Sequence, residues 1–266
     1  MKRVLVALLA ISMAAGVLTG CGSKGSEKTF TVGFDAEFPP YGYRDDSGEY
    51  VGFDLDLAAE VCKRQGWELV KQPIDWDAKD MELSSGAIDC IWNGFTMNGR
   101  EDDYEWSKPY MKNNQVFVVR GDSDINSEAD LAGKVVAVQK DSSALAALND
   151  EENADNIALR DSFSQLIEYA DYNTAFMDLE QGAVDAVAID IGVAQYQIAQ
   201  REEGKFVMLQ GEDNKLAVEQ YAVGFLKGND ELRDTVQKTL DEMAADGTFA
   251  QIAEKWGLTD SVCLGK

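Results

Sequence analysis

The sequence predicts an α/β protein made of two similar lobes, and three observations lead to this fold class. Strand-like and helix-like patterns alternate in the order strand, helix, strand, helix, strand between residues 29 and 91, which favours a parallel sheet. A later segment of the chain repeats part of this first unit in sequence. The length of 266 residues is sufficient for two lobes that each bury a core.

The internal repeat joins residues 83–91 (LSSGAIDCI) to residues 179–187 (LEQGAVDAV). The two segments share Leu, Gly, Ala and Asp, and exchange Ile for Val elsewhere. Each copy is typical of a helix end, a glycine stop and a buried strand. The second copy lies in its own alternation, with strands expected at 135–138 and 186–189 and helices at 142–148 and 174–179.

The elements around the first copy follow from local signals. Residues 29–34 alternate as a strand, and two consecutive prolines favour an extended loop at 35–41. A turn follows at 45–48. Asp54 is suited to cap a helix that runs to Gln65 and stops at Gly66. The next strand is expected at 68–72, and a short helix at 76–84.

The C-terminal part resumes the alternation. A strand is expected at 221–226, followed by a helix capped near Asn229 with one apolar face. Gly247 ends that helix, and Thr248 begins a last one that reaches Trp256. These helices are predicted to pack on the core.

Residues 1–20 are predicted to be a targeting segment. Two basic residues precede an apolar run at 4–18 that is short for a bilayer span. The sequence LTGC at 18–21 resembles the lipobox of bacterial lipoproteins, in which the cysteine is lipidated and becomes the mature N-terminus. The resemblance implies a lipoprotein signal peptide at 1–20, lipidation of Cys21 by acyl chains such as palmitate, and a flexible tether at 21–28. We expect a cell-membrane protein, lipid-anchored on the extracytoplasmic face.

Composition excludes several classes of function. The chain has no histidine, which removes Ser-His-Asp and Cys-His triads and His-ligated metal sites. Its net charge of −24 disfavours contact with nucleic acid and anionic lipid. Beyond Cys21 there are three cysteines, Cys62, Cys90 and Cys263, which leaves one disulfide with a spare thiol or three reduced thiols. Cys62 and Cys90 fall in a predicted helix and strand, where packing is the expected role.

The segment 91–110 (IWNGFTMNGREDDYEWSKPY) is interpreted as an anion clamp. A strand-like run ends in Asn93, Gly94 and Thr96, and Arg100 follows shortly after. Guanidinium offers a planar fork of donors that can bind both oxygens of a carboxylate. The alternative is that Arg100 balances the acidic residues at 101–103 on a solvated helix start.

A second polar surface is expected across from the clamp. Ligands of open α/β sheets gather beyond the carboxyl ends of strands, and the second repeat ends in Asp190. The segment 139–143 (QKDSS) also follows a strand and opens a helix, where free N–H groups suit an anion. Arg100 on one side and Asp190 on the other would bind a molecule with both charges, such as an amino acid. Asp190 could instead cap the next helix, and Ser142 and Ser143 could be only helix-start residues.

The chain after the targeting segment resembles, over nearly its whole length, the polar amino acid-binding proteins of bacterial ABC importers, which are extracellular solute-binding lipoproteins. The features that carry the resemblance are FPPY at 38–41, VGFDLDL at 51–57, the clamp ending EWSKPY at 105–110, LAGKV at 131–135 and AADGT at 244–248. It implies a two-lobe periplasmic-binding-protein-like fold with a hinge and a ligand cleft between the lobes. Lobe 1 would comprise 29–116 and 220–266, lobe 2 would comprise 117–219, and the hinge crossings would lie near 115–119 and 216–221.

The resemblance also assigns roles within the cleft. Arg100 and Thr96 would hold the α-carboxylate with help from the Gly94 backbone and Ser143, and Asp190 would take the α-ammonium. The side-chain walls would be Phe38 and Trp76, for which ordinary core packing is the alternative. Further lining positions would be Asp35, Asn93, Gln139 and Ser142. The chain departs from the family pattern in one respect, since the segment from Gly94 to Arg100 is one residue shorter than is common.

The sequence-based hypothesis is a receptor that binds an extracellular amino acid between its lobes and delivers it to an ABC permease with its ATPase. No bond is broken, and no cofactor or metal is expected. One alternative is a dehydratase-type enzyme on the same fold, with Asp35 or Glu37 as its carboxylic acid. A sensory module is another, although no signalling segment follows.

Overall fold

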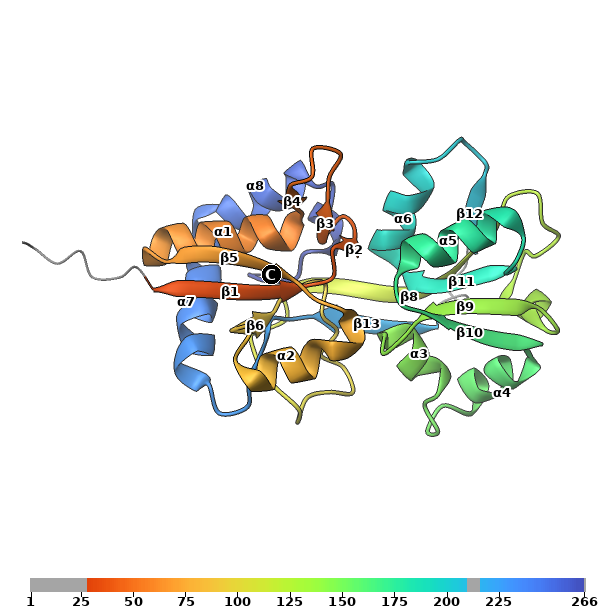
Figure 1. The fold of residues 1–266 in the computed structure, drawn as a ribbon, viewed down its shortest axis with the longest axis horizontal. Coiled ribbons are helices and arrows are strands. Elements are labelled where there is room, and N and C mark those ends of the chain that lie inside the picture. Colours follow the sequence, from red (N-terminus) through yellow and green to blue (C-terminus); the bar gives the residue numbers. More distant parts are fainter. Residues whose placement is uncertain (1–27, 210–215, 266) are drawn as a thin grey trace, which may run out of the picture.

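The fold consists of two lobes, each built on its own sheet with helices packed around it (Figure 1). A computed structural model describes residues 28–209 and 216–265. One lobe contains a five-stranded sheet of order β5-β1-β6-β14-β7, and the other contains a six-stranded sheet of order β10-β9-β11-β8-β12 with β13 also paired to β8. The predicted two-lobe α/β architecture is confirmed.

Lobe 1 combines parallel and antiparallel strands. Strand β1 pairs in parallel with β5 and β6, and β14 lies antiparallel between β6 and β7. The sheet strands are β1 Thr29–Phe34, β5 Glu68–Pro73, β6 Cys90–Ile91, β7 Glu105–Trp106 and β14 Gly224–Phe225. A small separate sheet comprises β2 Glu37–Phe38, β3 Gly42–Arg44 and β4 Tyr50–Val51. The helices are α1 Phe53–Gln65, η1 Trp76–Ala78, α2 Lys79–Ser85, α7 Asp230–Asp246, α8 Thr248–Lys255 and η3 Thr259–Ser261.

Lobe 2 repeats the parallel core of lobe 1. Strand β9 pairs in parallel with β10 and β11, and β8 lies antiparallel to β11. The strands are β8 Met111–Arg120, β9 Val135–Gln139, β10 Gln165–Tyr169, β11 Ala186–Asp190, β12 Phe206–Met208 and β13 Ala217–Tyr221. The helices are η2 Glu128–Leu131, α3 Ser143–Leu148, α4 Ala154–Ser162, α5 Tyr172–Gln181 and α6 Ile191–Ala199.

Two antiparallel strands, β8 and β13, run from one lobe to the other (Figure 1). The first half of β8, from Met111 to Gln115, pairs with β13, and the half from Gln115 to Arg120 pairs with β11 and β12. A single strand therefore belongs to the connection and to the sheet of lobe 2. This arrangement places the polar side chains of β8 beside the ends of β11 and β13.

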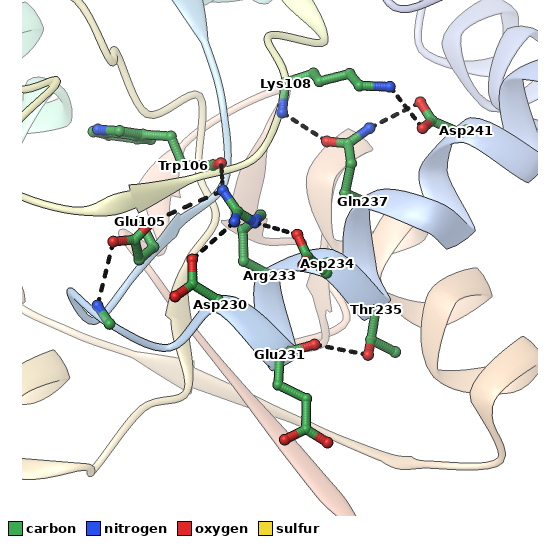
Figure 2. A network of polar contacts seen from close by, with 11 residues as sticks. Glu105, Trp106, Lys108, Asp230, Glu231, Arg233, Asp234, Thr235, Gln237 and Asp241 are labelled. Atoms are coloured by element: carbon green, nitrogen blue, oxygen red, sulfur yellow. Dashed lines mark hydrogen bonds and ion pairs between the residues drawn. The ribbon is translucent and has the colours of Figure 1, made fainter.

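The chain returns to lobe 1 after β13, and helix α7 is attached there by a polar network around Arg233 and Gln237 (Figure 2). The Arg233 guanidinium donates to the Trp106 carbonyl oxygen and pairs with Glu105 of β7. Gln237 accepts the Lys108 N–H at 2.6 Å. These bonds join helix α7 to the last part of the clamp segment 91–110.

Three sequence-based expectations about elements differ from the structure. Asp54 does not cap α1, because Gly52 is the N-cap residue and the Asp54 carboxylate turns inward, where it accepts the Gly94 N–H and the Tyr110 hydroxyl. The strand expected at 221–226 is two strands, β13 and β14. The helix expected at 76–84 begins as the short 3₁₀ helix η1. Strand β10 and helix α4 were not predicted.

The cysteines in the core of lobe 1 have the expected packing role. Cys62 of α1 and Cys90 of β6 are buried free thiols, which excludes a disulfide between these two residues. The targeting segment, Cys21 and the tether up to residue 27 lie outside the described residues. Within the described parts of the chain, no helix has the length and apolar character needed to cross a membrane.

Candidate functional site

A cavity lies between the two lobes, and the empty space in it and in its opening to solvent amounts to about 290 Å³. It collects the polar turn after β6, the aromatic residues of lobe 1 and the polar ends of β9 and β11. The lining residues are Phe38, Trp76, Asn93, Gly94, Phe95, Thr96, Arg100, Gln139, Ser142, Ser143 and Asp190. Phe95 is the one lining residue that the sequence did not predict, and Asp35 is the one predicted residue outside the lining.

Arg100 is half-buried in a turn at one side of the cavity. Its guanidinium donates to the carbonyl oxygens of Thr96 at 3.2 Å and Asp141 at 3.4 Å, and lies over the Phe95 ring. No acidic side chain of the described residues is within ion-pair distance of it, and residues 100–103 form turns. The alternative of a solvated helix start is therefore wrong, and the guanidinium is held at the cavity by neutral groups.

The hydroxyls of Thr96 and Ser143, both beside Arg100, differ in where their protons are directed. Thr96 Oγ1 lies 2.9 Å from Glu219 Oε2 and 3.3 Å from Ser143 Oγ, and its single proton is best placed to go to the carboxylate. Ser143 Oγ accepts from Gln115 Nε2 at 2.8 Å, which leaves its own proton available to the cavity. Ser143 is therefore the hydroxyl that can donate to a carboxylate bound by Arg100.

Gly94 lines the cavity, but its N–H is already used. It donates at 2.5 Å to Asp54 Oδ2, a carboxylate buried beneath the turn. Gly94 has a φ of 56°, and a Cβ atom there would lie 3.0 Å from the Tyr221 ring and 3.1 Å from the Phe38 ring. A glycine is thus required by both the left-handed backbone and the close approach of two aromatic rings.

Asp190 lies at the end of β11 with its carboxylate buried beside the cavity. It is the N-cap residue of α6, yet its side chain makes no capping bond, so the capping alternative is wrong. Oδ1 accepts from Asn113 and Gln115, each at 2.7 Å, and from the Tyr221 hydroxyl at 2.6 Å. Burial, and secondarily the charge of Glu219, raise the pKa of the Asp190 carboxyl.

Three buried polar residues beneath the cavity were missed by the sequence analysis: Asn113, Gln115 and Glu219. They lie on the connecting strands β8 and β13, which the sequence predicted only as hinge crossings. The available signal was spacing, because residues 113 and 115, like residues 219 and 221, share one face of a strand. A run of polar residues at that period in a strand between two lobes indicates a buried polar layer.

The aromatic walls belong to both the cavity and the core. Phe38 is 6% exposed, lines the cavity and packs against Tyr41 and Tyr172. Trp76 meets the Phe95 ring edge to face, with ring centroids 5.5 Å apart. Phe38 is thus both a core residue and part of the cavity wall.

The remaining predicted positions are polar and buried. Gln139 lines the cavity and donates to Asp35 Oδ2 at 2.7 Å, which places Asp35 directly behind the lining. Burial raises the pKa of Asp35 to about 6. Ser142 lines the cavity and also caps α3, since its Oγ accepts the Leu145 N–H. Asn93, at 1% exposure, completes the lining.

Direct bonds join the lobes around the cavity, so the structure is closed. Gln139 and Asp35 form one such bond. Lys79 at the start of α2 forms an ion pair with Asp141 of lobe 2, and Asn173 of α5 donates to Glu37. The Lys79 side chain is 2% exposed and that of Asp141 is 50% exposed, so the pair lies at the rim. In the described ranges no cluster of acidic or cysteine side chains could hold a metal ion.

Comparisons with known proteins agree on one family. The model of the bacterial extracellular solute-binding proteins, family 3, matches residues 30–259. An L-cystine-binding protein, TcyJ of Escherichia coli K12, is 28% identical over 96% of this chain and 95% of its own. A solved substrate-binding protein of an ABC uptake transporter from Streptococcus pneumoniae, with bound histidine, has a TM-score of 0.79 and 33% identity over 86% of this chain and 92% of that one. An ancestral arginine-binding protein bound to glutamine has a TM-score of 0.78 and 33% identity over 88% of this chain and 100% of that one.

Proposed function

The chain belongs to the bacterial extracellular solute-binding proteins of family 3, and from this premise we propose that it is the amino acid receptor of an ABC importer. The observation that carries the proposal is the pairing of opposite charges in one enclosed cavity. Arg100 from lobe 1 and Asp190 from lobe 2 line the same space, which fits the carboxylate and the ammonium of a free amino acid. The family is one of binding proteins, and the enzyme alternative is not retained.

Arg100 and Ser143 bind the α-carboxylate. The guanidinium is fixed by two carbonyl oxygens and the Phe95 ring, and Ser143 retains a proton to donate. Thr96 packs beside the carboxylate with its proton directed at Glu219. Asp190 binds the α-ammonium, and Phe38 and Trp76 enclose the side chain. The lobes close on the amino acid by a hinge motion about β8 and β13, with lobe 1 at 29–116 and 220–266 and lobe 2 at 117–219.

The receptor acts outside the cytoplasm and hands its amino acid to the permease. Family 3 proteins are extracellular, and the lipobox-like sequence at 18–21 supports attachment of Cys21 to acyl chains at the cell membrane. Expression of the full chain with Cys21→Ala tests the anchor. The wild type is expected to incorporate labelled palmitate and the variant to incorporate none, and a wild type without label would refute lipidation as the anchor.

The binding proposal is tested by thermal unfolding against a panel of the common amino acids, cystine and ornithine. An amino acid at about 100 times its Kd adds about 2.7 kcal/mol to the free energy of unfolding. The shift is expected with one or a few amino acids and is lost in Arg100→Ala. Arg44→Ala is the matched control, since Arg44 is exposed and its side chain donates to the Gly48 carbonyl oxygen within the same turn, away from the cavity. No shift with any member of the panel would refute the proposal.

A further inference from the structure

Two buried carboxylates, Asp190 and Glu219, face each other across strand β8. In the sheet register Asp190 of β11 lies opposite Gln115, and Glu219 of β13 lies opposite Asn113. Directly opposed residues of an antiparallel pair point to the same face of the sheet. Both carboxylates therefore project from the face on which Asn113 and Gln115 lie.

The two carboxylates share the same donors. Asn113 Nδ2 lies 2.7 Å from Asp190 Oδ1 and 2.9 Å from Glu219 Oε2. Gln115 Nε2 lies 2.7 Å from the first oxygen and 3.0 Å from the second. The two amide nitrogens thus bridge one oxygen of each acid. Asp190 and Glu219 are 3% and 5% exposed, so water does not screen them from one another.

Two buried carboxylate charges that share only neutral donors repel one another. Within the described residues, neither carboxylate forms an ion pair with a lysine or arginine, and the donors are amides, the Tyr221 hydroxyl and the Thr96 hydroxyl. Like charges buried at one site favour retention of a proton by the pair. The cavity side of Asp190 is the place where a cation can replace that proton.

We propose that Asp190 and Glu219 act as one proton-sharing ammonium site, in which entry of the amino acid's α-ammonium expels a single proton to solvent. The inference rests on the proposed function. It makes Glu219, which is buried beneath the cavity, a second residue that determines the affinity for the ammonium. The exchange is balanced, since one positive charge enters as ammonium and one leaves as a proton. Binding therefore strengthens as pH rises and weakens as the pair becomes protonated.

The other ionisable groups around the pair are accounted for. Burial raises the pKa of all three nearby phenols, so they remain neutral in the relevant range. Asp35 and Asp54, whose pKa values burial raises to about 6 and about 7, titrate in that range and are the competing sources of a proton. The phenols are those of Tyr41, Tyr172 and Tyr221, and the facing cation is Arg100 on the cavity lining.

The experiment is calorimetry of the purified protein with L-arginine and L-glutamine, whose charges do not change between pH 5 and pH 8. Titration at pH 6 in two buffers of different ionisation enthalpy counts the protons released. The wild type is expected to release about one proton, and to bind roughly 10- to 100-fold more weakly at pH 5 than at pH 8. Glu219→Gln removes one charge while keeping an amide oxygen as acceptor. It is expected to release fewer protons than the wild type and to lose less affinity over the same pH range, because burial alone still raises the pKa of Asp190.

Glu37→Gln is the matched control, because Glu37 is an interlobe carboxylate outside the pair that also bonds across the cleft. It is expected to keep the wild-type pH dependence. Binding by the wild type without proton release would overturn the inference and leave the proposed function intact, and this result does not depend on any variant folding. If Glu219→Gln releases as many protons as the wild type, the proton comes from Asp35 or Asp54, and the inference is overturned. Absence of binding to every amino acid of the panel would refute the proposed function and the inference together.

Discussion

Gly192 in the first turn of α6 is the position at which one methyl group should oppose closure of the lobes. A Cβ atom there would lie 2.3 Å from the Tyr41 hydroxyl oxygen and 3.1 Å from Cζ of the same ring. Tyr41 belongs to lobe 1, so the conflict arises only when the lobes are closed. Within α6 itself alanine is favourable, since it is a better helix former than glycine by about 1 kcal/mol.

The magnitude follows from how firmly Tyr41 is held. Its side chain is 1% exposed and meets the Tyr221 ring edge to face, with centroids 5.2 Å apart, so it cannot turn aside without displacing a second ring. Extra methyl groups in packed interiors cost about 1 to 3 kcal/mol. If that cost falls on the closed state alone, Gly192→Ala binds its amino acid roughly 5- to 150-fold more weakly.

Calorimetry of Gly192→Ala gives the affinity, and thermal unfolding without amino acid gives the stability. We expect weaker binding with an unchanged or raised unfolding temperature. Tyr41→Phe removes the oxygen that the methyl group would meet, so Gly192→Ala should cost less in that background. A Kd within about twofold of the wild type, or an equal loss in the Tyr41→Phe background, would refute the reasoning.

Three further outcomes are expected. Burial raises the pKa of Asp54 to about 7 and also raises the pKa of Asp190 in the folded protein, so these groups stabilise the amino acid-free protein most at low pH and lose that contribution as pH rises toward 7. The unfolding temperature should fall between pH 5 and pH 8, and a rise would contradict this assignment. Lys79→Met removes the ion pair at the cleft rim and should weaken amino acid binding by about fivefold in calorimetry. The loss is near 1 kcal/mol because the partner of Lys79 is half exposed. Lys108→Met, whose ion pair lies within lobe 1, should bind like the wild type. Gly52→Ala places a Cβ atom 2.1 Å from the Tyr41 carbonyl oxygen at a φ of 151°. Urea unfolding should show a loss of about 3 kcal/mol or more in the free energy of unfolding. A midpoint equal to that of the wild type would contradict this expectation.

The cavity lining was accessible from the sequence because its members follow strand ends. Gln139 and Asp190 are the last residues of the neighbouring parallel strands β9 and β11, and Thr96 lies in the turn that follows β6 of the other sheet. The family resemblance then assigned individual roles. Local spacing thus indicated which residues meet at the cavity, although it gave no distances.

The misses have a common physical origin in long-range contacts. Asp54 has the residue type and position of a helix cap, and only the tertiary structure shows that its carboxylate serves Gly94 and Tyr110 instead. Glu219 and Asn113 read as exposed polar residues of a crossing strand, since their burial depends on pairing between β8 and β13. Polar residues that satisfy one another cannot be recognised singly, because each alone would favour solvent.

The return of the chain to lobe 1 constrains the order in which the molecule can fold. The sheet of lobe 2 draws all its strands from β8 to β13, so this lobe can be completed from one continuous stretch. The sheet of lobe 1 needs β14 between β6 and β7, and its pairing of Ile91 with Gly224 spans the whole of lobe 2. Closing so large a loop is slow when the intervening chain is unstructured, and easier once lobe 2 has brought β8 and β13 together. The pairing of β8 with β13, which joins the lobes, therefore also brings β14 to its position between β6 and β7 in lobe 1.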